Sequence, residues 1–117
     1  MAITKGTGTS VIASTASSTT SSAVDVSANY DTEVYVDMVI VGTATGAATV
    51  QIQVSPDGGS TYYSPPSLLY TAPLAAGTYD VVIKVPVTAT HIKAAFTQQS
   101  GGTSSTVVVQ LNTVTAV

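Results

Sequence analysis

Apolar and polar side chains alternate along several short stretches of this chain, and turn-forming segments separate one stretch from the next. Alternation at a period of two is typical of a β-strand with one face in the core, whereas an amphipathic helix repeats every 3.6 residues. The segment 56–59 (Pro-Asp-Gly-Gly) is a strong turn signal of this kind. The alternation is clearest in residues 33–41, 49–55, 78–85, 91–98 and 106–115.

Shorter strands are also expected within residues 23–27 and 62–63, and residues 68–71 are expected to form a short strand or a loop. The total is six to eight strands, with no long helix. Because the connections are short, the strands are expected to pair antiparallel. Ser, Thr, Val and Ala make up more than half of the chain, and this composition suits strands joined by polar turns. The sequence therefore predicts an all-β fold, an antiparallel β-sandwich of jelly-roll type.

One face of each strand is expected to form the core. The inward positions are Val34, Val36, Met38, Ile40, Val50, Ile52, Val54, Tyr79, Val81, Ile83, Val85, Ile92, Ala94, Phe96, Val107, Val109 and Leu111. Four valines fall on nominally outward positions: Val39, Val41, Val82 and Val108. Either these strands are buried on both faces or the domain docks onto partners.

Residues 1–22 differ from the rest in being rich in Ser, Thr and Gly, with only Ile3, Val11 and Ile12 as large apolar residues. Three such side chains are too few to offset the entropy lost on ordering. We expect residues 1–22 to form an extended N-terminal arm that a partner orders, and residues 23–117 to form one β-sandwich domain.

Charge excludes several classes of function. Only 8% of the residues are charged, the net charge is -3, and there is no Arg. Nucleic-acid binding requires clustered cations, as does electrostatic binding to a membrane surface, so neither partner is expected. No apolar run approaches the ~18 residues of a membrane helix, and the start lacks the apolar segment of a secretory signal. The chain is expected to be made in the cytoplasm.

The residues that enzymes and metal sites require are scarce. There is no Cys, and His91 is the only His, on an outward strand position. Glu33 and Asp37 share a strand face about 13 Å apart, farther than a glycosidase pair. The residues Asp57-Gly58-Gly59 lack the Gly-Lys-Ser/Thr of a phosphate loop. We therefore expect no catalytic residues, no metal site and no cofactor, and we expect that the protein is not an enzyme.

The best candidate for a binding surface is a group of tyrosines near Pro65 and Pro66, since tyrosine suits both sugars and protein interfaces. The alternative is that one ring caps the core and the others flank a loop. Together with the apolar residues of the arm, the candidate interface residues are Ile3, Val11, Ile12, Tyr62, Tyr63 and Tyr70.

Two segments resemble a pattern found in small structural proteins of tailed bacteriophages. The first is Val-Gln-Ile-Gln-Val-Ser-Pro-Asp-Gly-Gly-Ser-Thr-Tyr-Tyr at residues 50–63. The second is Ala-Gly-Thr-Tyr-Asp-Val-Val-Ile-Lys-Val-Pro at residues 76–86, followed by His-Ile-Lys-Ala-Ala-Phe at 91–96. The resemblance covers residues 33–115, and head decoration (cement) proteins are the most similar in size and composition. Where similar sequences carry Arg on strands, this chain has Lys93 or uncharged residues.

The resemblance implies a virion protein that sits on the capsid exterior, binds the major capsid (shell) protein and stabilises the shell. It also implies a homo-oligomer, with a trimer favoured. Two alternatives remain open: a head-fibre or tail module that binds a carbohydrate or receptor through the tyrosines, and a structural component of the tail or connector.

Overall fold

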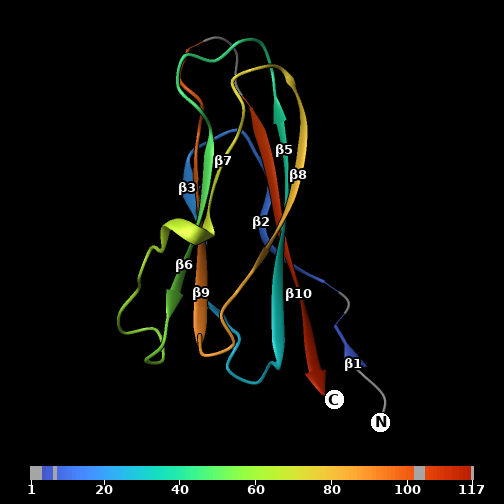
Figure 1. Ribbon diagram of the computed structural model, residues 1–117, viewed down its shortest axis with the longest axis vertical. Helices are drawn as coiled ribbons and strands as arrows, with labels where there is room; N and C mark the ends of the chain where they lie inside the picture. The colour runs from blue at the N-terminus through green and yellow to red at the C-terminus, as the bar shows by residue number, and fades with distance from the viewer. Residues whose placement is uncertain (1–3, 7, 102–104, 117) are drawn as a thin grey trace.

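The computed structural model describes residues 4–6, 8–101 and 105–116, which form two antiparallel β-sheets packed face to face (Figure 1). The molecule is elongated, with extents of 48 × 31 × 21 Å. Sheet A contains β1 (Thr4–Lys5), β2 (Thr9–Thr15), β5 (Asp31–Ile40), β8 (Gly77–Lys84) and β10 (Thr106–Ala116). Sheet B contains β3 (Thr19–Thr20), β4 (Val24–Asp25), β6 (Thr49–Ser55), β7 (Leu69–Thr71) and β9 (His91–Thr97).

The strand pairs are nested. In sheet A, β2 pairs with β10 and β5 pairs with β8; in sheet B, β3 and β4 pair with β9 and β6 pairs with β7. Along the chain, strands near the two ends pair with each other, β2 with β10. The next strands inward also pair, and the series ends with β6 and β7, which are neighbours in sequence. Pairing of β10 with β5 and of β9 with β6 closes each sheet. With β3 and β4 counted as one interrupted strand along β9 and β1 as an addition to sheet A, this is the strand order of an eight-stranded jelly roll, which confirms the predicted fold class.

The core lies between the two sheets and is formed by the predicted inward positions. Val36 of β5 lies between Val109 of β10 and Val81 of β8, and Phe96 of β9 lies opposite Val50 of β6. The predicted inward aliphatic side chains of β5, β6, β9 and β10 are almost completely buried, apart from Val54. The inward residues of β8 before Val85 are only half-buried, because β8 is an edge strand.

The segment 68–71, expected as a short strand or a loop, is mostly strand. Residues Pro66–Leu68 form a 3-10 turn, η1, in which the Leu68 amide donates to the Pro65 carbonyl, and strand β7 begins only at Leu69. Proline at the first position of the turn favours this conformation, since its φ is fixed and it has no amide to leave unpaired. Leu68 is buried at the end of the turn.

The described part of residues 1–22 lies within the two sheets. Strand β2 pairs with β10, the segment 16–18 crosses between the sheets, and β3 pairs with β9. The side-chain Nε2 of Gln98 donates to the carbonyls of Ala16 and Ser105. The backbone N–H of Gln98 donates to the Ser18 hydroxyl. The segment therefore supplies the first strand of each sheet. Its independence from the domain at 23–117 stays a prediction.

Candidate binding surfaces

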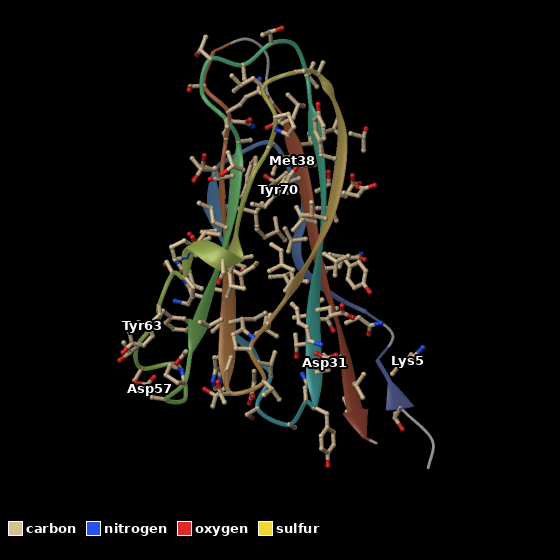
Figure 2. The ribbon with its side chains drawn as sticks, in the orientation of Figure 1. Lys5, Asp31, Met38, Asp57, Tyr63 and Tyr70 are labelled. Atoms are coloured by element: carbon tan, nitrogen blue, oxygen red, sulfur yellow. The ribbon has the colours of Figure 1, made fainter. Side chains whose placement is uncertain are left out.

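The structure does not bring the three candidate tyrosines together. Tyr70, on β7, packs against the core between the sheets, and burial, with a smaller effect of Tyr79, raises the pKa of its hydroxyl. Tyr62 and Tyr63 lie on the loop between β6 and η1, and Figure 2 shows Tyr63 far from Tyr70 along the long axis. Any shared surface therefore involves at most Tyr62 and Tyr63.

Hydrogen bonds fix the start of this loop. The Ser55 hydroxyl donates to Asp57 Oδ1 over 2.8 Å, and the Thr61 amide donates to the same oxygen over 2.9 Å. The Gly59 amide donates to the Ser55 hydroxyl, and Gly59 has a positive φ of 92° that favours glycine. The hydrogen bonds, first that from the Thr61 amide and then that from Ser55, lower the pKa of the Asp57 carboxyl. The loop is thus a rigid platform.

Tyr63 is the exposed aromatic of this platform. Its backbone amide and carbonyl both pair with Val54, while 57% of the residue remains accessible. A hollow of about 200 Å³ lies beside it, and Pro56, Pro86 and Thr88 also line this hollow. The lining is mostly apolar and also includes the hydroxyl-bearing residues Ser55 and Thr88, so the site could accept one face of a small ring.

Tyr62 has a different environment. The Lys93 ammonium lies 4.3 Å from the centroid of its ring, a distance typical of a cation–π contact. This pairing occupies the ring and the only cation on the outer face of β9. Tyr62 therefore serves to hold the loop against sheet B.

His91 has no catalytic arrangement around it. Its Nε2 lies 3.9 Å from Asp25 Oδ2, and its Nδ1 lies 3.2 Å from the Thr90 hydroxyl. That hydroxyl donates to the Ser55 carbonyl and accepts from the Gly58 amide, so it is engaged in holding the loop. Hydrogen bonds from the Ser27 hydroxyl and amide lower the pKa of Asp25. These contacts join β4, β9 and the loop.

The outer face of sheet A carries exposed apolar side chains. No other part of the described chain covers it, so the four outward valines are not buried on a second face within one molecule. Tyr35 and Val82 lie directly opposite each other on β5 and β8, 45% and 52% exposed. Val39 and Val108 are half-buried on the same face, and Val41 lies exposed just beyond β5.

Two carboxyl groups face each other in the middle of this surface. Asp37 on β5 and Asp80 on β8 are directly opposite in register. A hydrogen bond with Asp80, together with slight burial and the charge of Asp80, raises the pKa of Asp37. The sequence did not reveal this pair, because opposition depends on a register between strands more than 40 residues apart. The only signal was that both residues take outward positions.

Toward the end of the sheet the charges are balanced. Lys84 Nζ lies 3.5 Å from Asp31 Oδ2, and Lys84 is also opposite Glu33 across β5 and β8. Lys5 of β1 lines a small hollow with the same two acids. The negative charge without a nearby cation on this face is thus concentrated at Asp37 and Asp80.

A larger groove of about 1010 Å³ opens beside the end of β8. Its lining is mainly apolar and includes Tyr30, Leu68, Val85, Pro86 and Val87. The groove lies where the edge of β8 and the turn η1 leave the two sheets open to solvent. Of the half-buried side chains of β8, Ile83 lines this groove.

The candidate residues of the N-terminal segment serve the core. Ile12 is 5% exposed and belongs to the core cluster, and Val11 is half-buried against it. Ile3 lies outside the described residues. Ile12 is therefore buried in this arrangement, whereas Val11 keeps part of its surface exposed.

The fold and these surfaces define a jelly-roll β-sandwich. No family model, no curated protein and no solved structure matches the chain. Among residues 4–6, 8–101 and 105–116, no three His, Cys, Asp or Glu side chains are grouped to hold a metal ion. Within the same residues there is no helix of the length and apolarity needed to cross a membrane.

Proposed function

We propose that this protein is a virion structural protein, a decoration protein that binds the outer surface of a phage capsid and stabilises the shell. The observation that carries the proposal is the eight-stranded jelly roll, an architecture shared by viral capsid and lectin domains, in a chain with the strand and turn pattern of phage structural proteins. This inference rests on fold-level analogy and on the sequence resemblance.

The outer face of sheet A supports a role in assembly. A surface with exposed Tyr35 and Val82 and few charges costs little to desolvate against a second protein. In a free monomer the same surface gives little protection against association. The docking partner in this proposal is the major capsid protein, and the decoration protein acts as a homo-oligomer on the capsid exterior.

Binding to particles that lack the protein tests the proposal. Purified protein is mixed with such particles, the particles are sedimented, and bound protein is measured against concentration. We expect saturable binding that the Val82→Glu variant weakens, because this substitution adds a charge beside Tyr35 on the exposed apolar part of the face. Thr71→Glu, a matched change at an exposed position of sheet B, should bind normally. Absence of saturable binding by the unaltered protein would contradict the proposal.

A second function, binding of a carbohydrate, is favoured by one observation. Tyr63 presents an exposed ring held rigidly beside a hollow of about 200 Å³. Aromatic rings of this kind pack against the apolar face of a sugar while hydroxyl groups bind its rim. In this proposal the protein is a head-fibre or tail module that recognises a glycan.

Variants of Tyr63 and Tyr62 distinguish carbohydrate binding from a purely structural role of the loop. A glycan array with the purified protein should identify a ligand, and Tyr63→Ala should remove binding. Tyr62→Phe keeps the ring under Lys93 and should bind as the unaltered protein does. An array without any ligand would reject the carbohydrate function and leave the capsid proposal standing.

A further inference from the structure

Strand β8 forms an open edge of sheet A. It is eight residues long and, within the part of the chain that the structure describes, pairs only with β5. The Val85 amide, just beyond the end of β8, donates to the carbonyl of Thr32 on β5. Because backbone groups alternate in direction along a strand, those of Ile83, Val81 and Tyr79 also face β5.

The backbone groups of the intervening residues therefore point away from the sheet. Thr78, Asp80, Val82 and Lys84 each direct an amide and a carbonyl to the open side, and their side chains lie exposed on the outer face. Such an edge is a template for another extended strand. Pro86 has no amide, so a strand added here would end near it.

The order of side chains along this edge makes it complementary to itself. Asp80 and Lys84 lie two positions on either side of Val82. If a second copy of β8 pairs antiparallel about a two-fold axis at Val82, Val82 faces Val82 of the copy and Lys84 faces Asp80 of the copy. The two-fold axis produces this ion pair twice. Directly opposite side chains lie on one face about 5 Å apart, close enough for both pairs.

The charges select this register over its neighbours. A shift that centres the axis on Val81 places Lys84 opposite Thr78, and one that centres it on Ile83 places Lys84 opposite Val82. Only the register centred on Val82 supplies each Asp80 with a cation. That cation also offsets the repulsion between Asp80 and Asp37 within each molecule.

We propose that two copies of this protein associate through the edges of β8, in the register centred on Val82, to form one sheet that continues across the dimer. The pairing places Ile83 opposite Val81 of the copy, so the half-buried inward side chains of the two β8 strands lie next to each other. This proposal does not depend on capsid binding, because it rests on the edge of β8 alone.

Charge reversal tests the register with the full chain in solution. Sedimentation velocity over a concentration series should show a dimer of the unaltered protein, with a dissociation constant on the order of 10–100 μM for so small an interface. Lys84→Asp and Asp80→Lys should each weaken the dimer by about 10-fold or more, because each places like charges opposite each other. Lys93→Asp, an equal charge change on sheet B, should leave it unchanged.

Two combinations make the test specific. The double variant carrying both reversals should dimerise again, and an equimolar mixture of the two single variants should form heterodimers, since each then faces its opposite charge. Dimers of the single variants as tight as those of the unaltered protein would overturn the proposal, as would failure of both combinations to restore them. A monomer at all concentrations up to about 1 mM, or a trimer as the smallest assembly, would also overturn it.

A backbone variant provides an independent measurement. Val82→Pro removes an amide that points to the open side, so the bonds between β8 and β5 remain and the dimer loses two central hydrogen bonds. Val82→Thr keeps the amide and is the control. Circular dichroism confirms folding of both variants. Dimerisation of Val82→Pro equal to that of Val82→Thr would contradict edge pairing.

Discussion

At the scale of single residues, the opposition of Asp37 and Asp80 is the clearest departure from a stability-optimised surface. The carboxyls face each other across β5 and β8, and the pKa of Asp37 is raised, first by its hydrogen bond with Asp80. A group whose pKa is higher in the folded state stabilises that state below its unfolded pKa, and this contribution is lost as pH rises through the folded pKa. The pair is thus tolerated best in acid.

Asp37→Asn should therefore stabilise the protein at neutral pH. Removing one of two like charges directly opposite each other should raise the free energy of unfolding by about 0.2–1 kcal/mol at pH 7. Near pH 3, where Asp37 is protonated in both states, the difference should vanish. Urea unfolding at the two pH values measures it. Glu33→Gln is the control of opposite sign, because Glu33 faces Lys84. A variant less stable than the unaltered protein at pH 7 would contradict this account.

Asp57 stabilises the loop between β6 and η1, and its contribution changes with pH in the direction opposite to that of Asp37. Its pKa is lowered in the folded state by hydrogen bonds from Thr61 and Ser55, so its contribution is present above the unfolded pKa and lost as pH falls through the folded pKa. Asp57→Ala should speed hydrogen exchange at the Thr61 amide at pH 7. Ser60→Ala should not, because it keeps the backbone amide through which Ser60 bonds to Asp57. Equal protection in all three proteins would show that the network does not hold the loop.

At the scale of elements, strand β2 is the test of how the N-terminal segment contributes. Ile12 lies in the core, whereas the next residue, Ala13, is exposed. Ile12→Ala should cost about 2–4 kcal/mol of unfolding free energy by removing buried methyl groups and leaving a cavity. Ala13→Ser should cost little. Denaturant unfolding that leaves Ile12→Ala unchanged would indicate that β2 detaches from the sheet in solution.

The same elements show what the sequence could and could not predict. Alternation predicted β5, β6, β9 and β10 and their inward faces well, because long strands with a buried face need a strict period of two. Strands β2 and β3 were not predicted, because Ser and Thr dominate them and their order comes from pairing with β10 and β9. Local composition cannot report a partner strand that lies about 80 or more residues away.

The candidate site was predicted only in part, for a related reason. Proximity of Tyr62, Tyr63 and Tyr70 in sequence favoured one cluster, but a tyrosine on β7 turns inward while one on the preceding loop stays exposed. The outward valines did indicate an exposed apolar face. The pairing of Asp37 with Asp80 and the open edge of β8 both follow from the order of strands, which alternation alone does not determine.

At the scale of the whole molecule, the jelly roll presents two outer sheet faces, an open edge along β8 and a hydrogen-bonded loop after β6. The uncovered valines and tyrosine on sheet A adjoin the edge of β8, and Val82 belongs to both surfaces. A chain of this kind is suited to assembly, and a capsid exterior offers many identical positions for it. Many copies per particle are therefore the central expectation.

Quantitative mass spectrometry of purified particles, with this protein normalised to the major shell protein, tests that expectation most directly. The account predicts a copy number comparable to that of the shell subunit. A few copies per particle would contradict decoration and point to a fibre, tail or connector. Complete absence from the particles would contradict any structural role in the virion.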